Sequence, residues 1–155
     1  AAVDALWDSG LVVVCSAGYR GRDGHVHSLY WRGRGQVGHD DLSGFAQAPN
    51  AAGDPVAYYL HDADLHQVTY RGADGHIYEL YWPNVAPVTY WDLSAIAGAP
   101  PAASDPAVYY SAGTNTKHVI YRSADGNLNE IWWFPGSSAA TRARSSAPQY
   151  PAKSS

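Results

Sequence analysis

Residues 68–82 read VTYRGADGHIYELYW, and the chain repeats this pattern 51 residues earlier and 51 residues later. The earlier copy, residues 17–31, reads AGYRGRDGHVHSLYW, and the later copy, residues 119–133, reads VIYRSADGNLNEIWW. All three copies share a Tyr-Arg pair, then an Asp-Gly pair, and a final Trp. A constant period of this length is typical of repeat proteins, in which each copy forms one supersecondary unit.

Short motifs between these stretches recur with the same spacing: Asp41-Leu42-Ser43 with Asp92-Leu93-Ser94, and Asp54-Pro55 with Asp105-Pro106. The matches divide the chain into units of residues 2–52, 53–103 and 104–144, which we predict to form a single domain over residues 1–144. Residues 145–155 contain mostly Ser, Ala and Pro, and this composition predicts a disordered tail.

The middle unit reads as four strands, near residues 56–60, 66–71, 76–82 and 88–93. Residues 72–75 form a short hairpin loop between the second and third strands, in which we expect Gly75 to take a positive φ. Both faces of the third strand carry apolar side chains, so we expect that strand to be covered on both sides. No helical periodicity of useful length is present.

Four antiparallel strands in each 51-residue unit predict an all-β fold made of β-propeller blades. The alternative is an ordinary β-sandwich, although a sandwich does not require its strands to recur in groups of four at constant spacing. Three blades are fewer than the four to eight that usually close a propeller. We therefore expect either a homodimer that completes a six-bladed ring or a piece of a longer propeller chain.

Charge and hydrophobicity exclude several classes of partner. The net charge is −4, and no basic cluster rises above two short Arg pairs, so nucleic acid is not an expected partner. The longest apolar run, residues 11–15, is too short to span a membrane. Cys15 is the single cysteine, which excludes an intramolecular disulfide and favours a buried, inert thiol. The sequence does not identify a cellular compartment. We expect a soluble chain, and secretion is compatible with the sequence.

Catalytic and metal-binding patterns are absent from the sequence. His25 and His27 share a strand face but have no third ligand at a suitable spacing, and Asp40, Asp41, Asp62 and Asp64 are typical turn or strand-end carboxylates. No nucleotide-binding or nucleophile motif occurs, and the polar residues repeat with the units. Repetition favours multivalent binding, so we predict a protein that is not an enzyme and has no metal or cofactor.

Aromatic composition points to the kind of ligand. The chain has twelve Tyr and six Trp but two Phe, so most of its rings carry a polar edge. Sugars offer hydroxyl pairs to a carboxylate or guanidinium, and an apolar C–H face that stacks on such rings. Each unit supplies these residue types, so the sequence predicts carbohydrate binding in grooves between blades.

Residues 67–82 and 118–133 resemble blades of the six-bladed fucose-binding propeller lectins of fungi and bacteria. The resemblance implies a non-catalytic lectin that binds fucose or a related sugar. Glu79 and Glu130 match the position of the sugar-binding glutamate in that family. Unit one has Ser28 at that position. The arginine of the family falls at Gln67 and His118, or one residue later at Val68 and Val119, so the cation that would bind sugar hydroxyls is missing there.

The predicted sugar-binding residues are those repeat positions with suitable chemistry: Arg71, Glu79, Trp82, Trp91, Arg122, Glu130 and Trp133. Each has a structural alternative. The glutamates could pair with a repeat arginine, the tryptophans could pack between blades, and Arg20, Arg71 and Arg122 could brace the aspartate of their own hairpin. The alternative function is a non-catalytic propeller scaffold for protein–protein interaction.

Overall fold

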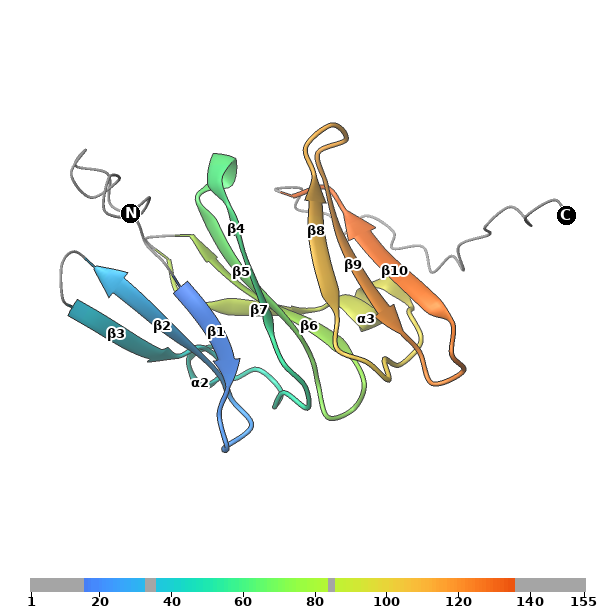
Figure 1. The fold of residues 1–155 in the computed structure, drawn as a ribbon, viewed down its shortest axis with the longest axis horizontal. Coiled ribbons are helices and arrows are strands. Elements are labelled where there is room, and N and C mark those ends of the chain that lie inside the picture. Colours follow the sequence, from blue (N-terminus) through green and yellow to red (C-terminus); the bar gives the residue numbers. More distant parts are fainter. Residues whose placement is uncertain (1–15, 33–35, 84–85, 136–155) are drawn as a thin grey trace, which may run out of the picture.

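Three antiparallel sheets stand side by side in chain order in the computed structural model, which describes residues 16–32, 36–83 and 86–135 (Figure 1). The first sheet contains β1 Ser16–Arg20, β2 Val26–Arg32 and β3 Gln36–Asp41. The second contains β4 Val56–Leu60, β5 Leu65–Arg71, β6 Ile77–Pro83 and β7 Thr89–Asp92, with a 3-10 turn η1 at His61–Ala63. The third contains β8 Ala107–Ser111, β9 Thr116–Arg122 and β10 Leu128–Trp133.

Each sheet follows chain order, as in a propeller blade, and the middle sheet has all four predicted strands. The all-β, blade-like fold class is therefore confirmed. We refer to the three sheets as blades one, two and three. The predicted first strand of unit one, the end of unit three and the predicted tail lie outside the described residues.

The Asp-Gly pairs form the hairpin turns, as expected. Gly24, Gly75 and Gly126 have φ values of 82°, 83° and 87°, a left-handed conformation that glycine adopts at little cost. The preceding aspartate of each turn accepts a hydrogen bond from the backbone N–H two residues further on, at 3.0 to 3.2 Å. The repeat thus encodes the same turn three times.

The strand interpretation of the units omitted two short helices. Two five-residue helices, α2 Leu42–Ala46 and α3 Leu93–Ala97, follow β3 and β7, so the fourth strand ends at Asp92 and not at Leu93. Asp41 and Asp92 cap these helices by accepting from backbone N–H groups at 2.8 Å. Five residues make fewer than two helical turns, so no helical periodicity exists for the sequence to reveal.

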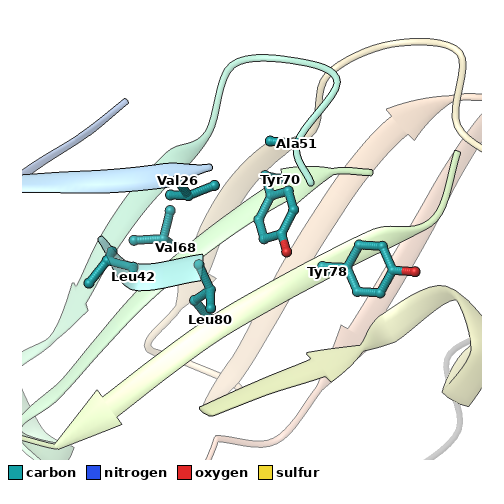
Figure 2. Close-up of a cluster of buried hydrophobic side chains, with 7 residues drawn as sticks. All are labelled: Val26, Leu42, Ala51, Val68, Tyr70, Tyr78 and Leu80. Carbon is teal, nitrogen blue, oxygen red and sulfur yellow. The ribbon is translucent and has the colours of Figure 1, made fainter. Parts of the chain in front are cut away.

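The core lies between the blades and is built twice from equivalent positions. Figure 2 shows the first cluster, in which Val26 and Leu42 of unit one lie next to Val68 and Leu80 of unit two. The second cluster is made by Ile77, Leu93, Ala102, Val119, Tyr121, Ile131 and Trp133. Since β6 supplies Leu80 to one cluster and Ile77 to the other, this strand is covered on both sides, as predicted.

Two tyrosines tie the core to the linkers that precede blades two and three. The Tyr70 hydroxyl donates to the Pro49 carbonyl and the Tyr121 hydroxyl donates to the Pro100 carbonyl, each at 2.8 Å. Burial raises the pKa of Tyr121 to about 12, so its hydroxyl stays a donor at neutral pH. None of the helices in the described part of the chain is long and apolar enough to cross a membrane.

Candidate functional site

Two glutamates, Glu79 on β6 and Glu130 on β10, occupy the same position of the repeat. In the antiparallel register, Glu79 lies opposite Thr69 and Glu130 lies opposite Ile120, so each glutamate shares its sheet face with that neighbour. The face of Glu79 meets the next blade, whereas the face of Glu130 belongs to the last sheet that the structure describes. These two environments differ in burial and in partners.

Glu79 lies in a closed polar cluster between blades two and three, with an exposed fraction of 1%. One carboxylate oxygen, Oε1, accepts from the Gln67 amide at 2.9 Å. The other, Oε2, accepts from the Thr69 hydroxyl at 3.1 Å and from the ammonium group of Lys117, which reaches across from β9 of blade three. Both oxygens are therefore already bonded within the protein.

Lys117 of blade three packs against Glu79 of blade two. Its side chain is also 1% exposed, and its Nζ lies 5.2 Å from the centroid of the Trp133 ring and 5.8 Å from that of Tyr58. Burial lowers the pKa of Lys117, while the Glu79 charge acts in the opposite direction. An ammonium held by a carboxylate between two aromatic rings leaves no polar group of this pair free for a ligand.

Glu130 is more open, with 30% of its side chain exposed. Its Oε1 accepts from His118 Nδ1 at 2.9 Å and from the Tyr109 hydroxyl at 3.3 Å. The Tyr109 ring stacks on His118 with centroids 4.4 Å apart and planes 1° from parallel. Burial, reinforced by the Glu130 charge, raises the pKa of Tyr109, so its hydroxyl stays a donor. Within the described residues, Oε2 of Glu130 has no partner.

The structure shows which of the two candidate positions in each unit lies beside the glutamate. Gln67 bonds to Glu79 and His118 bonds to Glu130, whereas Val68 and Val119 lie on the opposite face in the core clusters. The cation beside Glu79 comes instead from Lys117. Sequence reasoning did not find this lysine, because it lies in another unit and its repeat equivalent is His66.

Within the described residues, neither Arg71 nor Arg122 bonds to the glutamate of its own blade. Arg71 forms a salt bridge to Asp105 of the next unit, with Nε and Nη2 each 3.2 Å from Oδ1. It therefore braces a neighbouring aspartate and not the aspartate of its own hairpin. Arg122 is exposed and shares the sheet face of Glu130, since it pairs with Leu128.

The three predicted tryptophans lie in different parts of the molecule. Trp82 stacks on His66 at 5.2 Å and packs against the first core cluster, while Trp133 is buried in the second. Trp91 lies opposite Glu79 in the β6–β7 pair and its ring contacts Tyr81 at 4.8 Å. The tryptophan that shares the face of Glu130 is Trp132, which sequence reasoning missed although strand alternation could have identified it.

The histidines of the first and second hairpins have aspartate partners. His25 Nδ1 lies 2.8 Å from Asp41 Oδ2, and His76 Nδ1 lies 2.8 Å from Asp92 Oδ2. These hydrogen bonds raise the pKa of both histidines. Among the residues that the structure describes, no three His, Cys, Asp or Glu side chains are arranged to hold a metal ion.

No family model matches the sequence, and curated proteins give no match either. A search of solved structures does give similar proteins. A fucose lectin from Kordia zhangzhouensis, solved with methyl-fucoside, is similar over 91% of this chain and 94% of its own, with a TM-score of 0.63 and 15% identity. A mutant of AofleA from Arthrobotrys oligospora, with three arginines replaced by alanine, is similar over 88% of this chain with a TM-score of 0.55 and 18% identity. This chain spans 42% of that longer one. The similarity shows that the chain has the fold of these proteins.

Proposed function

We propose that the chain is a non-catalytic, carbohydrate-binding lectin whose main sugar site lies on the face of β9 and β10 around Glu130. The observation that carries this proposal is the half-exposed Glu130 carboxylate, which is positioned by His118 and Tyr109 and has one oxygen unpartnered within the described residues. A carboxylate oxygen of this kind accepts hydrogen bonds from sugar hydroxyls.

Two further side chains on this face suit a sugar. Trp132 lies two residues after Glu130 on the same strand face and is half-buried, so its indole offers an apolar surface to the C–H side of a sugar ring. Arg122 is exposed on this face and offers a guanidinium to hydroxyl groups. Glu130 and Arg122 were both predicted from the sequence, whereas Trp132 and Tyr109 come from the structure.

The other predicted positions fit a supporting role. Glu79 and Trp133 contact Lys117, Trp91 packs against the second core cluster, and Arg71 is engaged with Asp105. Unit one has Ser28 at the glutamate position. We therefore propose one strong sugar site per chain in place of a site in every groove. Fucose is the first ligand to test, because the similar Kordia structure is of a fucose lectin.

The open face of blade three supports a proposal on assembly. Leu128 is 44% exposed, although Val26 and Ile77, at the same repeat position in the other units, are fully buried (0%) against the next blade. An apolar face that is covered in two units calls for a partner in the third. We propose that blade one of a second copy covers it and that the reciprocal contact closes a six-bladed ring with two-fold symmetry. A Kordia lectin of nearly the same length has a similar chain fold.

A glycan array with the purified chain tests the function. We expect signal for fucose-containing or related glycans, and loss of that signal in Glu130→Gln. An array on which no glycan binds above background contradicts the proposal and favours a protein-interaction scaffold.

Light scattering tests the assembly. A mass twice the 16.7 kDa of one chain is expected, and Leu128→Asp should return the protein to a single chain. A wild-type chain that stays monomeric at micromolar concentration contradicts the ring of two copies.

A further inference from the structure

Blade two shows which kind of group the repeat glutamate binds when its face is covered. In blade two, Oε1 of Glu79 accepts from the uncharged amide of Gln67. Its Oε2 accepts from the ammonium of Lys117 and from the Thr69 hydroxyl. Tyr58 and Trp133 place their rings near the same ammonium. The interface of blades two and three therefore contains a site for a primary ammonium, and the protein fills that site with its own lysine.

Blade three carries the same face without that ammonium. Its Glu130 corresponds to Glu79 and its Tyr109 corresponds to Tyr58, each one repeat later. His118 takes the place of Gln67 on Oε1. Ile120 replaces Thr69 and has no side-chain donor. Within the described residues, the oxygen that holds the ammonium in blade two is thus the oxygen without a partner in blade three.

The sequence supplies only one lysine for this role. The repeat position of Lys117 holds His66 one unit earlier and Cys15 two units earlier. A second copy that covered blade three in the register of the other blades would therefore bring no lysine to Glu130. Within the described residues no lysine faces Glu130, so the position of the ammonium is open to a ligand.

We propose that the site around Glu130 prefers sugars that carry a primary ammonium, that is amino sugars such as glucosamine, over neutral sugars. This inference rests on the proposed carbohydrate-binding function and names its ligand class. The ammonium of such a sugar takes the place that Lys117 takes in blade two, beside a carboxylate and a tyrosine, while the ring hydroxyls bond to the remaining polar groups.

Exposure and net charge both favour this ligand. In the single chain, 30% of the Glu130 side chain is exposed, and in a ring of two copies the facing repeat position would hold no lysine, so a ligand ammonium does not compete with an internal one. The chain carries a net charge of −4, which attracts a cationic ligand more than a neutral one.

Calorimetric titration of the full chain with glucosamine, N-acetylglucosamine and fucose tests the inference. At about pH 7, where a primary amine of this kind is largely protonated, acetylation removes the charge and leaves the sugar ring in place. Because a charged hydrogen bond is the stronger kind, we expect glucosamine to bind at least about tenfold more tightly than N-acetylglucosamine. Glu130→Gln should bring the two affinities together.

Asp125→Asn is the matched control. It removes one negative charge from the same blade, at a hairpin aspartate away from the proposed site, and should keep the preference for glucosamine. Circular dichroism of both variants verifies that they are folded. If Asp125→Asn lowered the preference as much as Glu130→Gln, the effect would come from net charge and the inference would be overturned.

Three further outcomes separate this inference from the proposed function. Equal affinity for glucosamine and N-acetylglucosamine would overturn the amino-sugar preference and leave a neutral-sugar lectin in place. Binding of Nα-acetyl-lysine amide as tight as that of glucosamine would overturn the assignment to a sugar. Failure of all three sugars, together with a blank glycan array, would overturn the lectin function itself.

Discussion

Glu79 and Glu130 occupy one repeat position and face in the same direction, but one is sealed in a core and the other is half-exposed. The strands that carry them are alike, since both are third strands that follow the same Asp-Gly hairpin. The difference comes from the neighbour: blade three places Lys117 against Glu79, and the described residues place no such cation against Glu130. A repeat position thus acquires its role from the surface that packs on it.

Glu79 and Lys117 form a closed pair, that is, an ion pair buried between two blades, and this pair affects the stability of the protein. Removing two charges from water costs several kcal/mol for each ion, and a good ion pair with further hydrogen bonds offsets this cost. Glu79 has those further bonds from Gln67 and Thr69. The ion pair therefore offsets the cost of desolvation only while both Glu79 and Lys117 are present. Glu130 is partly exposed in the single chain, so its carboxylate is not fully desolvated.

The largest expected effect follows from breaking the closed pair. Lys117→Met should destabilise the protein by about 3–5 kcal/mol, because Glu79 would stay buried without its cation. Urea unfolding at a fixed protein concentration measures this loss. The double variant Lys117→Met with Glu79→Met should recover most of it. A single variant within about 1 kcal/mol of wild type would show that the pair is not desolvated in solution.

Reciprocal glutamine variants should separate binding from stability. Glu130→Gln should lower sugar affinity by about tenfold or more, because a charged hydrogen bond is lost, and change stability by less than about 1 kcal/mol. Glu79→Gln should lower stability and leave the sugar affinity of the folded protein within about twofold. Titration calorimetry and urea unfolding of both variants provide the test. An equal loss of affinity in both would contradict the distinction between the two positions.

A smaller effect is expected when blade three is made more like blade two. Ile120→Thr places a hydroxyl opposite Glu130, as Thr69 lies opposite Glu79. An internal hydrogen bond of about 0.5–1.5 kcal/mol would then compete with the ligand and weaken sugar binding by a few fold. Ile120→Val, which has no hydroxyl, is the control for the loss of volume. Equal affinity in the two variants would mean that the threonine does not reach the carboxylate.

The smallest effect concerns the hairpin histidines. The hydrogen bond that His76 donates to Asp92 raises the pKa of His76, so the pair contributes its full stability below about pH 6.5 and loses it as the pH rises through the raised value. His76→Asn, the residue type of unit three at Asn127, should reduce the fall in stability between about pH 6 and pH 8. Melting temperatures at the two pH values measure this change. The effect should stay below about 1 kcal/mol, because both side chains are about a third exposed to screening water. An unchanged pH dependence in His76→Asn would assign the slope to other groups.

Local features of the fold could be predicted from the sequence because short-range chemistry determines them. The Asp-Gly hairpins, the four strands of the middle unit and the two-sided burial of β6 all follow from turn residues and strand alternation. The helices after Asp41 and Asp92 were missed because they are too short to show a period. In the proposed site, Glu130 and Arg122 were predicted from the sequence, and strand alternation could also have pointed to Tyr109 and Trp132.

The sequence by itself determined that three equivalent units exist and which side chains each sheet face presents, because spacing and alternation are properties of one strand at a time. Only the tertiary structure decided which glutamate is sealed and which is open. Lys117 and Glu79 are 38 residues apart, and their contact depends on how two blades pack. The same packing joins Arg71 to Asp105 and leaves Leu128 exposed. Burial and ion pairing depend on the distance between elements, which the order of residues along a strand does not contain.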